Sequence, residues 1–356
     1  MDINSKKIFK TLNPNKVWIP ILIGLGIVFY LFYSDPDVNQ STLALIVDAR
    51  LGSILVAVVV LLARDLGYIY RIRTLTNRDI SWTSSIYVII LWEFASAVTP
   101  SVVGGTAVAV FILLKEGIKF GRSLAYVLLT AVLDNMFFVL GAPIVMFFAQ
   151  GIIFPDTQAF EMQIGSSLKL LFWVSYSLIV IYTSVMAFAL LFKPRAFKWL
   201  LLKITTIKWL RKWRYDANIQ GDEMILASEQ LKGKAANYWM KIIGSTIFIW
   251  SARYIMLNAL ITSFSDLSFQ NHLLVFSRQV VMWIVMLISP TPGSSGTAEF
   301  FFIQFFNEFL GDYTFITNIL WRLMSYYPYL ILGALFLPRW VRRVFFKKPR
   351  SEQSQL

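Results

Sequence analysis

The sequence predicts an all-α, polytopic integral membrane protein, and two observations lead to that prediction. Of the 356 residues, 57% are hydrophobic and 15% are charged, whereas about 25% of the residues in an average soluble domain are charged. A helix crosses the hydrocarbon layer with roughly 17–25 mostly apolar residues, and such segments recur along the chain. We therefore exclude a soluble enzyme and predict about six full spans. They are residues 17–33, 48–70, 121–148, 168–192, 241–263 and 314–337.

Two further apolar regions are each interrupted by Thr, Pro and Gly residues. The first is apolar over 80–98 and again over 106–114, and the second over 273–290 and again over 297–310. As helices, the shorter pieces are only about 14 and 21 Å long, so neither crosses about 30 Å of hydrocarbon. We predict that each region forms a re-entrant helical hairpin, which returns to the side from which it started.

The distribution of charge predicts the orientation. If both hairpins return and the N-terminus lies inside, the cytoplasmic segments hold 28 of the 33 Lys and Arg residues. The external segments hold six Asp and Glu residues and no Lys or Arg. Because cationic loops favour the cytoplasmic side, we predict a protein of the bacterial cytoplasmic (inner) membrane with both termini in the cytoplasm. The predicted cytoplasmic segments are 1–16, 64–80, 115–122, 193–241 and 339–356.

The predicted topology contains an inverted repeat. Each half has two spans, a hairpin and a further span, and the two hairpins enter from opposite sides. Inverted repeats with interrupted helices are typical of alternating-access transporters, which bind their ligand near the midplane. The predicted parts are a tail, 1–16; a transmembrane domain, 17–338, with halves 17–148 and 168–338; and a basic tail, 339–356.

The second half also contains a basic loop, residues 193–240. Its cations alternate with Trp and Leu side chains. This pattern is typical of a helix that lies at the surface of an anionic leaflet. An alternative is that the loop only orients the chain by its positive charge, and the two interpretations are compatible.

With this topology we predict that six ionisable residues lie buried at membrane depth. An ionised side chain in hydrocarbon costs at least about 2.5–3.5 kcal/mol, so such residues need partners. Because Arg binds phosphate and carboxylate through a planar fork, the functional interpretation is that these arginines bind an anionic headgroup, which the carboxylates replace in its absence. The structural alternative is that all six form internal ion pairs. They are Glu93, Asp134, Arg253, Arg278, Glu299 and Arg322.

The interruptions of the two hairpins add a second kind of candidate anion site. Helices that begin near Thr106 and Thr297 would present unpaired N–H groups and a positive dipole end at membrane depth. Glycines in the interruptions let the backbone turn and let a ligand approach it. The alternative for Glu299 is that it only complements the dipole of its own helix. The other candidate binding residues are Thr99, Pro100, Gly104, Gly105, Asn135, Pro292, Gly293 and Gly296.

Composition excludes several other classes of chemistry. The chain has no Cys and a single His, His272, which excludes thiol catalysis and a His-rich metal site. It also has no GxSxG motif and no phosphate-binding loop. We therefore predict no catalytic residue and no cofactor. The net charge of +13 is concentrated in segments beside the predicted spans, so we predict no nucleic-acid partner.

Four stretches of sequence resemble one known family. They are residues 99–105 leading to Lys115-Glu116-Gly117, residues 290–299, residues 321–328 and, more weakly, Leu133-Asp134-Asn135. The family is the transmembrane, or flippase-like, family of lysylphosphatidylglycerol synthase, which includes the lipid-flipping half of the multiple peptide resistance factor. The resemblance covers nearly the whole chain and implies functional roles for Asp134, Glu299 and Arg322. Many relatives have a basic and an acidic residue around the first interruption, where this chain has residues 101–106.

The resemblance implies movement of an anionic or aminoacylated phospholipid, or of a polyprenyl-linked lipid, between leaflets. The aminoacyl-transferase domain of the synthases has no counterpart here, because only 18 residues follow Pro338. We therefore predict a lipid flippase-like transporter, not an enzyme, whose partners are membrane phospholipids or lipid-linked headgroups. Two alternatives stay open: a membrane-embedded transferase acting on lipid-linked substrates, and a non-catalytic membrane scaffold.

Overall fold

The computed structural model describes residues 44–99, 102–149, 153–155, 168–287 and 294–345. Within these ranges the regular structure is helical and no strand is present, which confirms the predicted all-α class. The predicted first span, 17–33, lies outside the described residues. Five segments have the length and apolar composition needed to cross a membrane: Leu51–Leu75, Phe120–Ala149, Leu168–Phe192, Ala236–Thr262 and the composite Thr297–Phe345.

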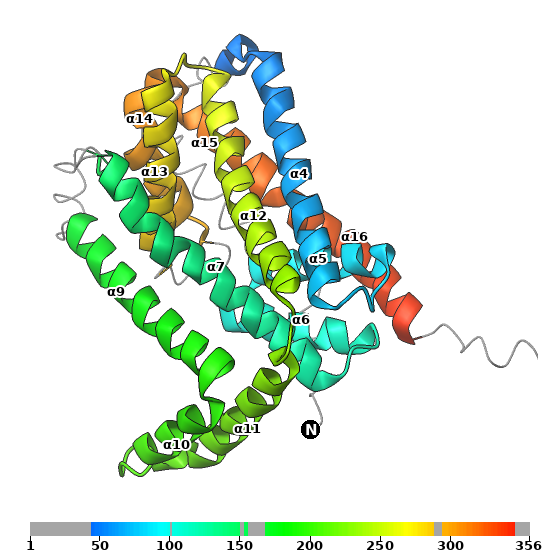
Figure 1. Cartoon of the computed structure of the whole chain (residues 1–356). Coiled ribbons are helices and arrows are strands. Elements are labelled where there is room, and N and C mark those ends of the chain that lie inside the picture. The colour runs from blue at the N-terminus through cyan, green and yellow to red at the C-terminus, as the bar shows by residue number, and fades with distance from the viewer. Residues whose placement is uncertain (1–43, 100–101, 150–152, 156–167, 288–293, 346–356) are drawn as a thin grey trace, which may run out of the picture.

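Figure 1 shows the helices as a bundle of long rods with a smaller helical pair, α10 and α11, at its lower end. The elements are η2 (Leu45–Asp48), α4 (Leu51–Leu75), α5 (Trp82–Val98), α6 (Val102–Lys115), α7 (Phe120–Ala149), α9 (Leu168–Ala187), η3 (Phe188–Phe192), α10 (Pro194–Ile204), η4 (Arg211–Trp213), α11 (Arg214–Leu231), α12 (Ala236–Thr262), α13 (Phe269–Met286), α14 (Thr297–Leu310), η6 (Gly311–Tyr313), α15 (Thr314–Ser325) and α16 (Tyr327–Phe345).

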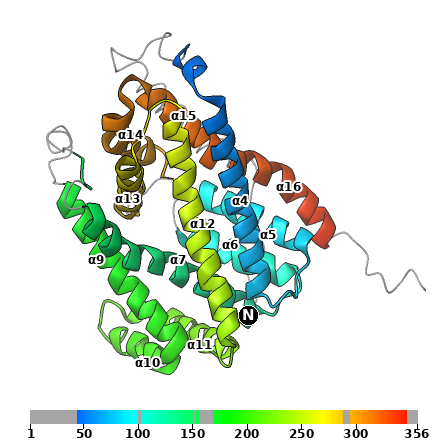
Figure 2. The ribbon, with the colours of Figure 1, turned by 45° about the horizontal axis from the view of Figure 1, so that its top comes forward.

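α4 packs along α12, and the two helices lie side by side in both ribbon views (Figures 1 and 2). A Cβ atom on Gly67 of α4 would lie 2.9 Å from the Ile249 side chain of α12. Glycine at this position therefore permits the close approach of the two helices. Small residues are frequent at such contacts in membranes, where van der Waals packing holds helices together.

Two of the cations that were counted as cytoplasmic are buried inside the bundle. Arg64 and Arg71, which were assigned to the predicted cytoplasmic segment 64–80, are only 0% and 2% exposed. Both lie on α4, which continues without interruption to Leu75. The helix accommodates them because each guanidinium has a carboxylate partner inside the bundle.

The segments that flank each predicted hairpin lie at the same end of the molecule. Arg122 at the start of α7 contacts Asp79, which precedes α5, with an N–O distance of 3.3 Å, and in Figure 1 α5 and α6 lie below the pair α13 and α14. At the upper end, Tyr313 after α14 stacks on Phe264, which precedes α13, with 5.2 Å between ring centroids. In addition, α5 packs against α6, and α13 against α14. Each helix pair therefore starts and finishes at one end, and the two pairs use opposite ends.

Helix α6 begins one turn earlier than the sequence predicts. The interruption was expected to extend through Gly104 and Gly105, but the helix begins at Val102 and includes both glycines. Its 14 residues correspond to about 21 Å rather than the expected 14 Å. A Cβ atom on Gly105 would lie 2.5 Å from Oγ of Ser96 on α5. This glycine therefore serves close packing between α5 and α6 rather than a turn of the backbone.

The predicted span 314–337 is divided into two helices. α15 ends at Ser325 and α16 begins at Tyr327, with Tyr326 outside helical geometry at φ −129° and ψ −59°. The break has a covalent cause, because Pro328 has no N–H to donate and its ring opposes a continuous helix. Beyond the break, α16 packs against α5 so closely that a Cβ atom on Gly333 would lie 2.2 Å from the Phe94 ring.

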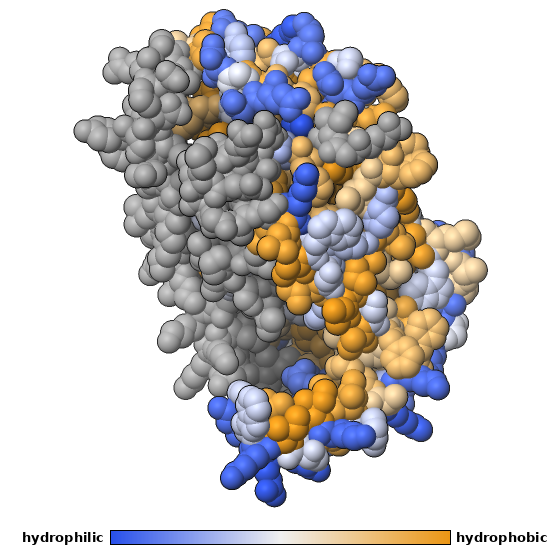
Figure 3. All heavy atoms as spheres, turned by 90° about the vertical axis from the view of Figure 1, so that its left-hand side faces the viewer, coloured by the Kyte–Doolittle hydropathy of each residue, from blue (hydrophilic) through white to orange (hydrophobic). Residues whose placement is uncertain are grey.

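Hydrophobic and hydrophilic side chains are distributed over the surface as expected of an integral membrane protein. Figure 3 shows a band of hydrophobic side chains between hydrophilic residues at the top and bottom of the visible face. Large apolar side chains on the outside of α4 and α9 are exposed, among them Leu55, Leu62, Leu170 and Leu178. In water such a continuous apolar surface would be unfavourable, whereas lipid chains solvate it.

Candidate functional site

A cavity of about 210 Å³ lies between α5, α12, α13, α15 and α16, and we call it the central cavity. Both predicted hairpins contribute to its wall, through α5 and α13, and so does the break at Tyr326. Its lining mixes Trp, Tyr and Met side chains with ionisable and amide groups. The ionisable and amide residues are Glu93, Arg253, Gln279 and Arg322.

Arg322 is held at the edge of the central cavity by Glu299. Nε of Arg322 lies 2.8 Å from Oε1 of Glu299, and the two side chains are only 7% and 1% exposed. The guanidinium also lies over the Tyr326 ring, 4.0 Å from its centroid. Glu299 accepts a 2.6 Å hydrogen bond from the backbone N–H of Gly296, which caps α14. Glu299 therefore both caps its helix and balances the charge of Arg322.

Two ionisable side chains of the central cavity form no salt bridge with the described residues. Glu93 on α5 and Arg253 on α12 each lack an oppositely charged group within 4.0 Å. Arg253 lies over the Trp250 ring, 5.1 Å from its centroid, and its buried Nε has no hydrogen-bond partner among those residues. A buried donor without an acceptor costs about 1–3 kcal/mol. The cavity thus offers a cation and a carboxylate that are both available to a ligand.

Tyr329 connects the central cavity to an ion pair that the sequence analysis missed. Its hydroxyl donates a 2.8 Å hydrogen bond to Oδ2 of Asp65 and accepts one of 2.6 Å from Nη2 of Arg64. Nη2 of Arg64 also lies 2.7 Å from Oδ1 of Asp65. The signal that points to these residues is an Arg-Asp pair inside a helix of 25 residues that is otherwise apolar around them.

Asp134 pairs with Arg71 beside the central cavity but does not line it. The two side chains form a bidentate contact, with Nη1–Oδ1 2.5 Å and Nη2–Oδ2 3.1 Å. Thr246 accepts a hydrogen bond from Arg71 at 3.0 Å, and Trp250 Nε1 donates one to Asp134 at 3.0 Å. The pair therefore ties α4, α7 and α12 together. The sequence analysis identified Asp134 but not its partner.

Arg278 lies on α13, outside the central cavity. Its Nη2 is 2.7 Å from Oε2 of Glu308 on α14, and its Nη1 donates a 3.0 Å hydrogen bond to the carbonyl of Phe305. The guanidinium also lies over the Phe309 ring, 5.0 Å from its centroid. These contacts join the two helices of the second predicted hairpin, so the structural interpretation suits this arginine best.

The remaining predicted residues lie around the two interruptions or outside the described residues. Thr99 donates its hydroxyl to the Ala95 carbonyl at 2.7 Å, and Thr297 donates to the Ser294 carbonyl at 2.9 Å. Gly296 caps α14 with φ +90°, a conformation that favours glycine. Thr106 and Asn135 are partly buried and do not line the central cavity. Pro100, Pro292 and Gly293 lie outside the described residues.

The groups that line the central cavity suit the binding of a polar, charged ligand. Arg253 and Arg322 offer planar donors that match phosphate oxygens. Glu93 offers an acceptor for a hydroxyl or ammonium group, and the aromatic wall offers surface for an apolar glycerol backbone or chain. In the part of the chain that the structure describes, no three His, Cys, Asp or Glu side chains form a group that could hold a metal ion.

Comparison with known proteins places this architecture in a family. The family model described as the lysylphosphatidylglycerol synthase TM region matches residues 17–333. A UPF0104 membrane protein from Archaeoglobus fulgidus is 26% identical to the chain over 344 residues, which cover 89% of this chain and 94% of that protein. No solved structure matches. Because the family model extends from the predicted first span to α16, the chain belongs to the family of the lysylphosphatidylglycerol synthase TM region.

Proposed function

We propose that this protein is a lipid flippase-like transporter that binds the headgroup of a lipid in the central cavity. The observation that carries the proposal is Arg253, a partly buried guanidinium without a counter-ion among the described residues, which faces a cavity between the two helix pairs. An anionic headgroup would supply the missing acceptor. The volume of about 210 Å³ is smaller than the roughly 300–1,000 Å³ of pockets that enclose whole ligands. It suits a headgroup whose acyl chains stay in the bilayer.

The charges of the cavity define the class of lipid that we propose. Arg253 and Arg322 suit the phosphate of an anionic phospholipid or of a polyprenyl phosphate. Glu93 suits a hydroxyl or amine in the same headgroup, as an aminoacylated phospholipid carries. The chain needs no chemical step for this role, so we propose a transporter and not an enzyme.

The proposed topology has six full spans and two re-entrant hairpins, formed by α5–α6 and α13–α14. The support is that the flanks of each pair meet at one end, through Asp79–Arg122 and through Phe264–Tyr313. We further propose that α10 and α11 and both termini lie in the cytoplasm of a bacterial cell. With this orientation the cavity lies between two helix pairs that enter from opposite leaflets, as alternating access requires.

Labelling of introduced cysteines tests the proposed topology. The natural chain has no Cys, so any label reports the introduced residue. Asp312 in η6 and Lys119 between α6 and α7 are both exposed, and in Figure 1 the two segments lie at opposite ends of the bundle. A cysteine at Asp312 should react with an impermeant thiol reagent on intact cells, whereas one at Lys119 should react only after permeabilisation. External labelling of the cysteine at Lys119 would rule out the proposed first hairpin.

Lipid movement in reconstituted vesicles tests the function. Wild-type protein should expose fluorescent phosphatidylglycerol of the inner leaflet to an external quencher faster than protein-free vesicles do. Arg253→Gln should slow this movement by about tenfold or more, because a charge-assisted hydrogen bond contributes roughly 1.5–3 kcal/mol. Lys241→Gln removes an exposed charge from the same helix and serves as the matched control.

Three outcomes would contradict the proposal. Equal rates of lipid movement for Arg253→Gln and wild type would show that the central cavity is not part of the transport path. Absence of any protein-dependent movement, together with a modified lipid formed from an aminoacyl or nucleotide-sugar donor, would instead identify a transferase. Absence of both would favour the scaffold.

A further inference from the structure

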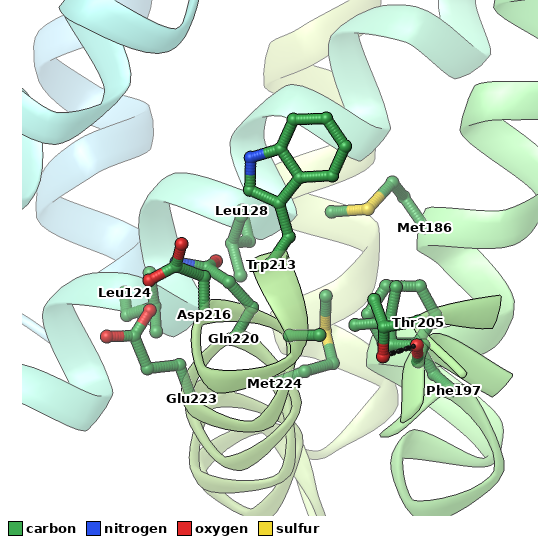
Figure 4. A pocket seen from close by; sticks show the side chains of 12 residues that line it. Leu124, Leu128, Met186, Phe197, Thr205, Trp213, Asp216, Gln220, Glu223 and Met224 are labelled. Carbon is green, nitrogen blue, oxygen red and sulfur yellow. Dashed lines mark hydrogen bonds between the residues drawn. The ribbon is translucent and has the colours of Figure 1, made fainter. Parts of the chain in front are cut away.

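A second cavity, of about 420 Å³, lies at the lower end of the bundle between α7, α9, α10 and α11, and we call it the lower cavity. It shares no lining residue with the central cavity. Figure 4 shows Trp213 above the axis of α11, Met186 and Phe197 on one side, and Leu124 on the other. The volume falls within the range of roughly 300–1,000 Å³ that is typical of small-molecule sites.

Most of the lower cavity is apolar. α7 contributes Leu128, α9 contributes Met186, and α10 contributes Phe197 and Leu201, while Met224 of α11 forms part of the opposite wall. Such a surface binds hydrocarbon and not a soluble ion. Its neighbour α10 carries exposed apolar and aromatic side chains, among them Trp199, as helices that lie against a bilayer do.

One edge of the lower cavity is polar and acidic. Asp216, Gln220 and Glu223 follow each other on α11 at spacings of four and three residues, which places them on one face of the helix. Figure 4 shows the three side chains on the same side of α11, next to Leu124. Among the described residues, neither carboxylate has a Lys or Arg nitrogen within 4.0 Å.

The lack of ion pairs is informative because the same segment of the chain is rich in cations. Segment 193–241 contains 11 Lys and Arg residues, and the neighbouring Asp222, on another face of α11, does pair with Lys198 at 2.6 Å. Asp216 alone has a simple explanation, since it lies in the first turn of α11 and complements the helix dipole. Glu223 lies two turns further and has no such role. Burial raises the pKa of the Glu223 carboxyl above its ordinary value, as expected for a carboxylate turned toward an apolar space.

We propose that the lower cavity binds an amphiphile whose head carries an ammonium group. The ammonium group lies at Asp216 and Glu223, and the hydrocarbon portion lies along Met186 and Phe197. Charge complementarity selects the head, and the apolar wall selects an amphiphile over a soluble amine. The proposal goes beyond the translocation proposed above and does not depend on it, because binding here is measured without lipid movement.

Quenching of Trp213 fluorescence by brominated amphiphiles tests the proposal on the full-length protein in maltoside micelles. The probes are bromododecylammonium, bromododecyl phosphate and bromododecanol, and the Trp213 signal is the difference between wild type and Trp213→Phe. We expect the ammonium probe to reach half-maximal quenching at a mole fraction about fivefold to tenfold lower than the phosphate probe does. A difference in affinity of this size corresponds to two solvent-screened charge contacts. Soluble ethylammonium should not displace the bound probe at comparable concentration.

Variants test whether the preference for the ammonium probe depends on the carboxylates of Asp216 and Glu223. Asp216→Asn/Glu223→Gln should abolish the preference for the ammonium probe, whereas Glu229→Gln, which removes an exposed charge from the same helix, should retain it. Asp216→Asn alone changes an exposed side chain and should reduce the preference even if the double variant does not fold. Ala217→Leu places a larger side chain in the lower cavity and should weaken quenching by all three probes.

Four results would overturn the proposal. Equal quenching by the three probes would show that the head is not selected. A preference that survives in the double variant would place the ammonium group elsewhere. Unchanged quenching in a folded Ala217→Leu protein, or displacement by ethylammonium, would show that the apolar wall does not hold the ligand.

Discussion

Glu299→Gln should lower the free energy of unfolding by about 3–5 kcal/mol, the usual cost of removing one partner from a buried ion pair. The substitution leaves the Arg322 guanidinium, which is 7% exposed, without its counter-ion. Replacement of both residues, in Glu299→Gln/Arg322→Met, should recover part of the loss, because the second change removes the stranded charge. Unfolding in detergent with increasing SDS measures the stability of both variants, and the exposed Asp312→Asn serves as the control.

The same variant also separates two roles of Glu299. Glu299 does not line the central cavity, whereas Arg322 does. If Glu299 acts as the resident counter-ion of Arg322, then Glu299→Gln should bind an anionic headgroup more tightly and release it more slowly. If the carboxylate only caps α14, the headgroup affinity should not change. A stability loss below about 1 kcal/mol, the range of a dipole contact, would contradict the ion-pair role.

Asp134→Asn is expected to cost about 3 kcal/mol of stability, because Arg71 has a side chain that is only 3% exposed and depends on this carboxylate. Lipid movement per folded molecule should nevertheless be retained, since the pair lies outside the central cavity. Asp79→Asn breaks the exposed pair with Arg122 and should cost at most about 1 kcal/mol. It is the matched control for the loss of an Asp–Arg contact.

The measurement compares SDS unfolding with lipid movement normalised to the amount of folded protein in the vesicles. Arg71→Gln in the Asp134→Asn background should restore stability, because two amides replace the stranded charge. Loss of lipid movement in a stable Asp134→Asn/Arg71→Gln protein would show that Asp134 has the functional role that the family resemblance implies.

The class of fold could be predicted from the sequence because the length of an apolar segment is a local property. The span around α7 illustrates this, since residues 121–148 were predicted and the helix covers Phe120–Ala149. The start of α14 was also predictable, because Gly296 and Glu299 form a local cap. By contrast, the division at Tyr326 was missed, although Pro328 carries the signal for it, because the apolar run continues through the break.

The partners of the buried charges could not be predicted, because they come from residues far apart in the chain. Arg71 and Asp134 are separated by 63 residues, and Arg64 and Tyr329 by 265. A single sequence shows that Asp134 needs a cation but does not show which one. The burial of Arg71 was missed for the same reason. Arg64 has its carboxylate partner next to it in the chain, at Asp65, but the Tyr329 hydroxyl reaches it only in the folded bundle.

The break at Tyr326 is a hinge between two helical arms in the second half of the molecule. One arm, α15, carries Arg322 at the central cavity, and the other, α16, is pressed against α5 at the contact of Gly333 with Phe94. Since Pro328 donates no hydrogen bond across the joint, bending there sacrifices little backbone bonding. The Tyr326 hydroxyl donates a 3.1 Å hydrogen bond to the carbonyl of Ala97, near the end of α5. A ligand that displaces Arg322 would therefore also act on the first helix pair, through the contact of Tyr326 with α5.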